Sequence, residues 1–220
     1  MTQPYGINQM KYMTQPYKVS MLFPSIVHEY DFEEFDANPM IDFCYDVKNK
    51  NSVGKINSNR GGWHSEFFNI TDDNVISSAL AEGLGKSVFT SIQPTLGVDV
   101  TYWIMINPPT SYNTSHTHPE AHLSGVMWIK TPENCGDIQF NNPAEFSGFV
   151  ELNSYIDEVK DKTGTFGSIF YTPKVGKMLT FPSSLRHEVK VNESNEDRIA
   201  VSYNIRTVSY THLRAHETVV

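Results

Sequence analysis

A cluster of histidines with one glutamate, near the middle of the chain, could bind a metal ion. The segment from His116 to His122 reads HTHPEAH and precedes the apolar run LSGVMWI. In a strand, residues two apart face the same side and lie roughly 6.6 Å apart at the backbone. Two side chains at this spacing can both reach a first-row metal at about 2.0–2.2 Å. The spacing permits two pairs, His116 with His118 or His118 with Glu120, and both stay open at this point.

A complete mononuclear site needs a third ligand from elsewhere in the chain. His187, in FPSSLRHEV, enters a predicted strand and is the candidate. Two histidines and one carboxylate with open positions select Fe(II) for oxygen chemistry, whereas three histidines suit iron or zinc. His122 is a weaker candidate at the start of a strand. His28 and His64 are isolated, and we interpret them as structural, although His64 could line a pocket.

Arg198 could bind a carboxylate close to this site. Residues 192–197 are all polar and lie between two apolar strands, which predicts a hairpin. A tight hairpin would place His187 opposite Ser202. Arg198 would lie on the same face of the strand as Ser202, four residues and roughly 13 Å along it. A small dicarboxylate that chelates the metal could then receive two parallel hydrogen bonds from the guanidinium. Four residues before the metal motif could line the pocket of this co-substrate: Tyr102, Trp103, Asn107 and Asn113. Core packing explains the two aromatic ones equally well.

Helix patterns come first along the chain and strand patterns follow. Residues 38–50 predict a short helix, and residues 73–92 predict a longer one that Thr71 or Asp72 could cap. In the longer helix an apolar residue recurs at every fourth position: Ile76, Leu80, Leu84, Val88 and Ile92. Seven β-branched or aromatic runs follow: residues 98–107, 122–130, 136–141, 166–173, 177–182, 187–192 and 198–205. This order indicates an antiparallel two-sheet sandwich or jelly roll with helices packed outside.

The two ends of the chain stand apart from this pattern. MTQPY occurs twice within the first 17 residues, and we expect residues 1–20 to be a flexible tail. The predicted domain spans residues 21–207, with a first strand beginning near Met21. Residues 208–220 contain SYTHLRAHET, which resembles a translated DNA-sequencing adapter, so we interpret this segment as an assembly artefact. His212 and His216 are therefore excluded as ligands.

Composition narrows the class of protein. A formal net charge of −8 and the lack of Lys or Arg runs argue against nucleic acid as a partner. No apolar segment is long enough to span a bilayer. Cys44 and Cys135 are far apart in sequence, and without a signal peptide we expect free thiols and a cytoplasmic location. The sequence leaves the oligomeric state open.

Three segments together resemble a known family. They are NPPTSYNTSHTHPEAHLSGVMWI, GDIQFNNP and GKMLTFPSSLRHEVKVNESNEDRIAVSYNI. Their ordered motifs resemble the Fe(II)/2-oxoglutarate oxygenases, in the branch with HxHP followed by LSGV that is common in marine bacteria and their phages. The resemblance covers residues 21–206 and is strongest over the last hundred of them. If the gene is a phage gene, the expected location is the cytoplasm of the host.

The resemblance implies a mainly β fold with flanking helices, a double-stranded β-helix (cupin-like jelly roll) with Fe(II) near its open end. It implies a dioxygenase that hydroxylates an unknown small-molecule or peptidyl substrate and releases succinate and carbon dioxide. It favours His116, His118 and His187 as catalytic metal ligands over the set with Glu120. Arg198 would bind the distal carboxylate of 2-oxoglutarate, with Ser202 as a helper.

Two other functions fit the same residues. One is a three-histidine, cupin-like dioxygenase that does not use 2-oxoglutarate, and the other is a non-catalytic metal-binding structural module. Substrate choice would lie in loops outside the barrel, such as residues 146–167. The polar loop of residues 52–62 could be a lid or only a connection.

Overall fold

The computed structural model describes residues 24–92, 97–143, 156–164 and 166–208. The helices are α1 Asn38–Lys50, α2 Val75–Lys86, α3 Val88–Ser91 and α4 Asp157–Thr163. The first strands are β1 His28–Asp31, β2 Asn59–Arg60, β3 Trp63–His64, β4 Phe68–Asn69, β5 Gly97–Asn107 and β6 Tyr112–His116. The later strands are β7 Leu123–Lys130, β8 Ile138–Asn141, β9 Ser168–Tyr171, β10 Lys177–Pro182, β11 His187–Val189 and β12 Arg198–Val208. The predicted tail at 1–20 and segment 209–220, including His212 and His216, lie outside the described residues.

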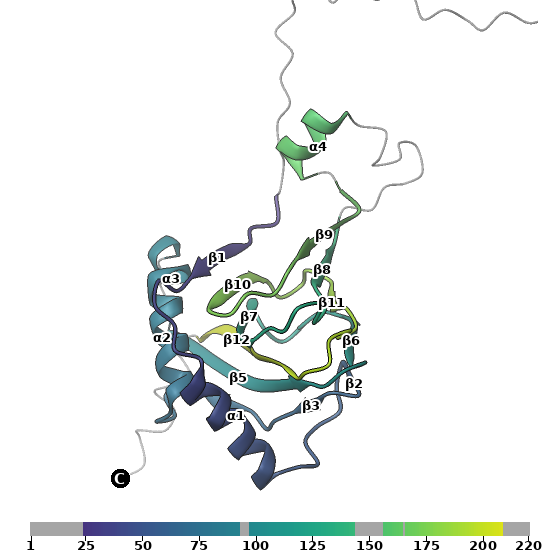
Figure 1. Cartoon of the computed structure of the whole chain (residues 1–220). Helices are drawn as coiled ribbons and strands as arrows, with labels where there is room; N and C mark the ends of the chain where they lie inside the picture. The colour runs from purple at the N-terminus through teal and green to yellow at the C-terminus, as the bar shows by residue number, and fades with distance from the viewer. Residues whose placement is uncertain (1–23, 93–96, 144–155, 165, 209–220) are drawn as a thin grey trace, which may run out of the picture.

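Two antiparallel sheets form the body of the protein. The larger has the order β1-β10-β7-β12-β5-β3, with β4 also pairing with β5, and the smaller has the order β2-β6-β11-β8-β9. Figure 1 shows α1, α2 and α3 on one side of the larger sheet and the smaller sheet on its other side. The fold is therefore mainly β, a jelly roll with flanking helices, as the sequence predicted.

The two faces of the larger sheet have different roles. On β12, Ile199, Val201 and Tyr203 belong to the hydrophobic core between the sheet and the helices. The alternate residues Arg198 and Ser202 face the opposite way and line a cavity between the sheets. Because successive side chains of a strand point to opposite faces, one strand serves the core and the cavity together.

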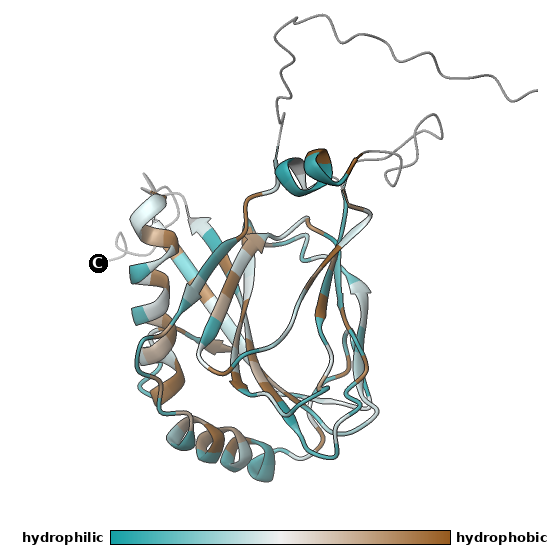
Figure 2. Ribbon diagram, turned by 45° about the horizontal axis from the view of Figure 1, so that its top comes forward, coloured by the Kyte–Doolittle hydropathy of each residue, from teal (hydrophilic) through white to brown (hydrophobic). Residues whose placement is uncertain are grey.

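The helices cover the outer face through apolar stripes. Ile76, Leu80, Leu84 and Val88 are fully buried, as the four-residue spacing predicted, whereas Ile92, the last member of the predicted stripe, is 37 % exposed. Figure 2 shows hydrophobic residues interleaved with hydrophilic ones along the helices, as expected for elements with one buried side. The predicted cap was wrong, because the side chain of Asn74 accepts hydrogen bonds from the first-turn amides. The predicted helix is also divided at Ser87 into α2 and α3.

Two strand predictions were wrong. The first described strand begins at His28, and residues 24–27 before it are not in a strand. Residues 192–197 do not close a hairpin, because β11 pairs with β6 and β8 in the smaller sheet, whereas β12 pairs with β5 and β7 in the larger one. The polar segment is a crossover between the sheets. Asn192 is buried there, and its side-chain amide donates to the carbonyls of Asn107 and Glu196.

Candidate metal centre

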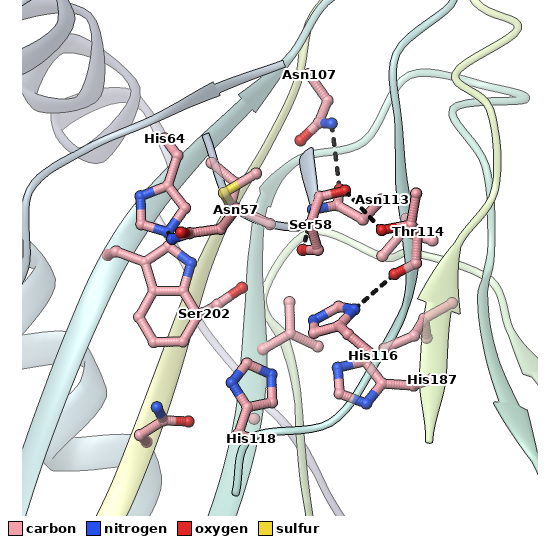
Figure 3. A pocket seen from close by; sticks show the side chains of 18 of the residues that line it. Asn57, Ser58, His64, Asn107, Asn113, Thr114, His116, His118, His187 and Ser202 are labelled. Carbon is pink, nitrogen blue, oxygen red and sulfur yellow. Dashed lines mark hydrogen bonds between the residues drawn. The ribbon is translucent and has the colours of Figure 1, made fainter. Parts of the chain in front are cut away.

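Three of the predicted ligands come together between the sheets. His116 ends β6 and His187 begins β11, and these two residues are direct partners across the ladder. His118 follows β6, where its backbone amide donates to the carbonyl of Ser183 at 2.9 Å. One nitrogen atom from each of the three rings lies within 4.8 Å of the others. Figure 3 shows the three rings gathered on one side of the cavity.

Hydrogen bonds fix which ring nitrogens are free. Nδ1 of His116 lies 2.7 Å from the carbonyl of Thr114, and Nδ1 of His187 lies 2.9 Å from the carbonyl of Leu185. A carbonyl oxygen can only accept, so each Nδ1 carries the proton and donates it. This leaves Nε2 of both rings with a lone pair for a metal, in the tautomer that a backbone carbonyl commonly selects.

All three rings are held in the neutral form. Burial lowers the pKa of His187 to about 3 and of His118 to about 4, and the neighbouring His116 contributes to both shifts. Burial also lowers the pKa of His116, with a smaller effect from Arg186. Three neutral imidazoles at neutral pH match what a divalent transition metal requires of its ligands.

Glu120 and His122 lie apart from this group. The Glu120 side chain is 83 % exposed, and its Oε2 lies 3.1 Å from Nη2 of Arg206. Nδ1 of His122 accepts a hydrogen bond from the backbone amide of Thr207. Of the two pairs that the sequence left open, the structure therefore brings His116 and His118 to the candidate site.

Arg198 lies in the same cavity, which has a volume of about 430 Å³. The residue is 2 % exposed, and its Nη1 donates to the carbonyls of Cys135 and Gly136 at 2.6 and 3.1 Å. Burial lowers the pKa of the guanidinium to about 10, so it stays charged at neutral pH. Among the described residues, no carboxylate forms an ion pair with it. A buried cation without a counter-ion is costly and suits an anionic ligand.

The other predicted pocket residues divide into two groups. Asn107, Asn113, Ser202 and Trp103 line the cavity. Asn107 donates to Asn113, which donates to the hydroxyl of Ser58, and Figure 3 shows this chain above the histidines. The suggestion that Tyr102 lines the pocket was wrong.

Tyr102 is fully buried on the helix side of the larger sheet. Its hydroxyl lies 3.0 Å from that of Ser77 and donates to Asn74. Strand alternation could have excluded it, because residues 103 and 107 share one face and residue 102 must lie on the other.

Two cavity residues received little or no weight from the sequence. His64 is buried, and Asn57 precedes it in the polar loop of residues 52–62. Nε2 of His64 lies 3.1 Å from the side-chain nitrogen of Asn57, and its ring stacks beside Trp103. The position of His64 follows from the β3–β5 pairing, which a two-residue strand does not reveal in the sequence.

The two sheets and the histidine group define a jelly roll with a candidate metal site. Residues 101–204 match the family model described as "Putative 2OG-Fe(II) oxygenase". The match runs through β5 to β12 and includes all three histidines and Arg198. The predicted family resemblance, enzyme class and cofactors, Fe(II) with 2-oxoglutarate, are therefore confirmed. A comparison with curated proteins gives no significant match.

Solved structures share the fold at low sequence identity. A Pseudomonas putida prolyl-4-hydroxylase is 14 % identical, with 80 % of this chain and 89 % of that chain covered and a TM-score of 0.52. A Trichoplax adhaerens prolyl hydroxylase in complex with a hypoxia-inducible-factor peptide fragment is 10 % identical, with 83 % and 82 % covered and a TM-score of 0.52. HygX from Streptomyces hygroscopicus, with nickel, 2-oxoglutarate and hygromycin B bound, is 8 % identical, with 79 % and 80 % covered and a TM-score of 0.53. These likenesses show the fold alone.

The sequence also gave expectations for the cysteines and for membrane spans. Cys44 and Cys135 are both free and buried, and burial raises the pKa of the Cys44 thiol to about 12. Within the described ranges, no helix is long and apolar enough to span a membrane.

Proposed function

We propose that His116, His118 and His187 are the metal ligands of this Fe(II)- and 2-oxoglutarate-dependent dioxygenase. The three donor atoms within 4.8 Å and the neutral rings support this set. A three-histidine site lacks the carboxylate of the usual facial triad, so it leaves the full charge of a divalent metal to be offset by the co-substrate. When bound, Fe(II) with 2-oxoglutarate supplies the oxygen-dependent hydroxylation, with succinate and carbon dioxide as co-products.

The protein's own residues bind and orient the co-substrate in this proposal. Arg198 binds its distal carboxylate, and the amides of Asn107 and Asn113 line the path between Arg198 and the metal. Ser202, two cavity-facing positions along β12 from Arg198, offers a hydroxyl beside Trp103. The observation that carries the proposal is the buried Arg198, which forms no ion pair with any described residue, in one cavity with three neutral histidines.

The substrate belongs to one of two classes in this proposal. Two proteins with a similar fold are described with a peptide fragment and with the small molecule hygromycin B. We keep a small molecule or a peptide as the proposed substrate and the cytoplasm as the proposed location. Residues 21–207 remain the proposed domain.

The test is an anaerobic titration. The full chain is loaded with Fe(II), and 2-oxoglutarate is added while the weak visible charge-transfer band of the chelate is recorded. We expect a saturable band in the wild type and in Glu120→Ala, and no band in His116→Ala because that variant loses a metal ligand. Glu120→Ala is the matched control, since Glu120 belongs to the same motif but is exposed.

The alternatives predict other results. Tightly bound iron without a band would refute the use of 2-oxoglutarate and favour the cupin-like dioxygenase or the structural module. Loss of the band in Glu120→Ala with retention in His116→Ala would replace the proposed ligand set by the one with the carboxylate.

A further inference from the structure

The cavity floor has two different ends. Cavity-facing residues of β12 and β5 pair across the ladder in three rows, Arg198 with Asn107, Ala200 with Met105, and Ser202 with Trp103. Under the proposed function, the co-substrate extends from the metal to the Arg198 row. The Trp103 side of the last row is then left for the substrate, while the hydroxyl of Ser202 on the neighbouring strand serves the co-substrate.

Three aromatic rings form a wall at this second end. His64, Phe67 and Trp103, here called the aromatic wall, all line the cavity. The rings of His64 and Trp103 are nearly parallel at a centroid distance of 5.5 Å, and Phe67 stands edge-on to Trp103, also at 5.5 Å. The ring of the candidate ligand His118 lies 5.7 Å from that of Trp103. A group held against the wall is therefore close to the metal site.

The wall carries no net charge. Nδ1 of His64 lies 2.6 Å from the carbonyl of Ser65 and must donate to it, and Nε2 faces the side-chain nitrogen of Asn57 at 3.1 Å. That arrangement needs a lone pair on Nε2, which only the neutral ring has. Burial also lowers the pKa of His64.

The rim beside the wall disfavours a cation. The ammonium of Lys55 lies 4.9 Å from the centre of the Phe67 ring, so this face already holds a positive charge. Lys55 also forms an ion pair with Glu66, so the carboxylate next to this face already has a partner. Among the described residues that line the cavity, no aspartate or glutamate is present, and Arg198 is the one with a fixed charge.

We propose that the aromatic wall binds an uncharged, apolar ring or chain of the substrate and holds it beside the metal. This proposal rests on the proposed function, because it assigns the Arg198 end to the co-substrate. A cationic group would lie near the ammonium of Lys55, where the carboxylate of Glu66 is already paired with that lysine, and an anionic group would lie away from Arg198. Transfer of either charge from water into this end is unfavourable without a partner. An apolar group gains contact with three rings at no such cost.

Three probes of matched shape test the proposal. Cyclopentanecarboxamide is neutral, cyclopentylmethylammonium is a cation and cyclopentanecarboxylate is an anion. Binding of each is measured by anaerobic equilibrium dialysis with the full chain, Fe(II) and saturating 2-oxoglutarate. We expect the neutral probe to bind at least about tenfold more tightly than either charged one. Equal or tighter binding of a charged probe would overturn the proposal.

A pair of phenylalanines supplies the variant and its control. Phe67 and Phe170 are each 53 % exposed, and each has a lysine ammonium over its ring, but only Phe67 lines the cavity. We expect Phe67→Ala to weaken the neutral probe about two- to tenfold and Phe170→Ala to leave it unchanged. Equal effects of the two variants would refute the role of the wall.

The charge-transfer band is recorded in the same samples. A band without a preference for the neutral probe overturns this inference and leaves the proposed function intact. A missing band refutes the proposed function, and the dialysis still supports or overturns the binding preference of the wall.

Discussion

Replacement of Arg198 by methionine is expected to weaken 2-oxoglutarate binding at least about 30-fold. Arg198 is 2 % exposed, and its guanidinium has no carboxylate partner among the described residues, so the co-substrate would supply its counter-ion. Removal of one member of a buried, hydrogen-bonded charge pair costs about 2–5 kcal/mol. With a tenfold change in Kd for every 1.4 kcal/mol, the lower limit corresponds to roughly 30-fold. Iron affinity should be unchanged, because Arg198 is not one of the candidate ligands.

The assay is the anaerobic charge-transfer titration, with Arg206→Met as the matched control. Arg206 lies on the same strand, but its side chain is 43 % exposed and does not line the cavity. We expect Arg206→Met to bind 2-oxoglutarate as the wild type does. Unchanged affinity in Arg198→Met, or an equal loss in both variants, would show that Arg198 does not bind the distal carboxylate.

Two further predictions concern stability. A Cβ at Gly125 would lie 2.2 Å from the Tyr203 ring and 2.5 Å from a backbone carbonyl, so Gly125→Ala should lower the free energy of unfolding by about 1–3 kcal/mol. The control is Gly85→Ala in α2, where an added Cβ meets no atom within 4 Å, and it should raise the free energy of unfolding by about 0.5–1 kcal/mol. Urea unfolding that finds Gly125→Ala more stable than Gly85→Ala would contradict the packing argument. In the metal-free protein, burial lowers the pKa of His187 from an ordinary 6.5 to about 3. Between these two pH values the unfolded chain binds more protons than the folded protein, so the free energy of unfolding falls as the pH drops from 6.5 towards 3. The melting temperature should therefore depend less on pH between 7 and 4 in His187→Gln than in the wild type. The same pH dependence in both proteins would count against a lowered pKa of His187.

The parts of the fold that were predictable have strong local patterns. The bounds of α1 at 38 and 50 were correct, and the apolar stripe of α2 gave its buried face. Strand β6 was missed because its sequence YNTSH has no apolar alternation, and it exists only through pairing with β2 and β11. The hairpin prediction failed for a related reason. A polar turn between two apolar strands shows that the chain reverses, but not that the strands on either side share a sheet.

The candidate site was predictable to the extent that it depends on spacing. The separation of His116 from His118 and the single late His187 were enough to propose a metal group. Arg198 was proposed from the size of a dicarboxylate along a hairpin with His187 opposite Ser202, and that register was wrong, because Ser202 pairs with Trp103 and Val126. The aromatic wall was not predicted as a unit. Its members come from β3, from the segment after it and from β5, and only the β3–β5 ladder brings them together.

The incorrect hairpin leaves the proposed chemistry intact and changes its geometry. A hairpin would have placed His187 and Arg198 on neighbouring strands of one sheet, both on the same wall of a pocket. The crossover instead places His187 on the smaller sheet with His116, and Arg198 on the larger sheet with Trp103. A co-substrate that joins the metal to Arg198 must therefore span the space between the sheets. Its binding would link the two sheets, so 2-oxoglutarate with iron should raise the thermal stability of the wild type more than iron alone, and this increment should be lost in Arg198→Met.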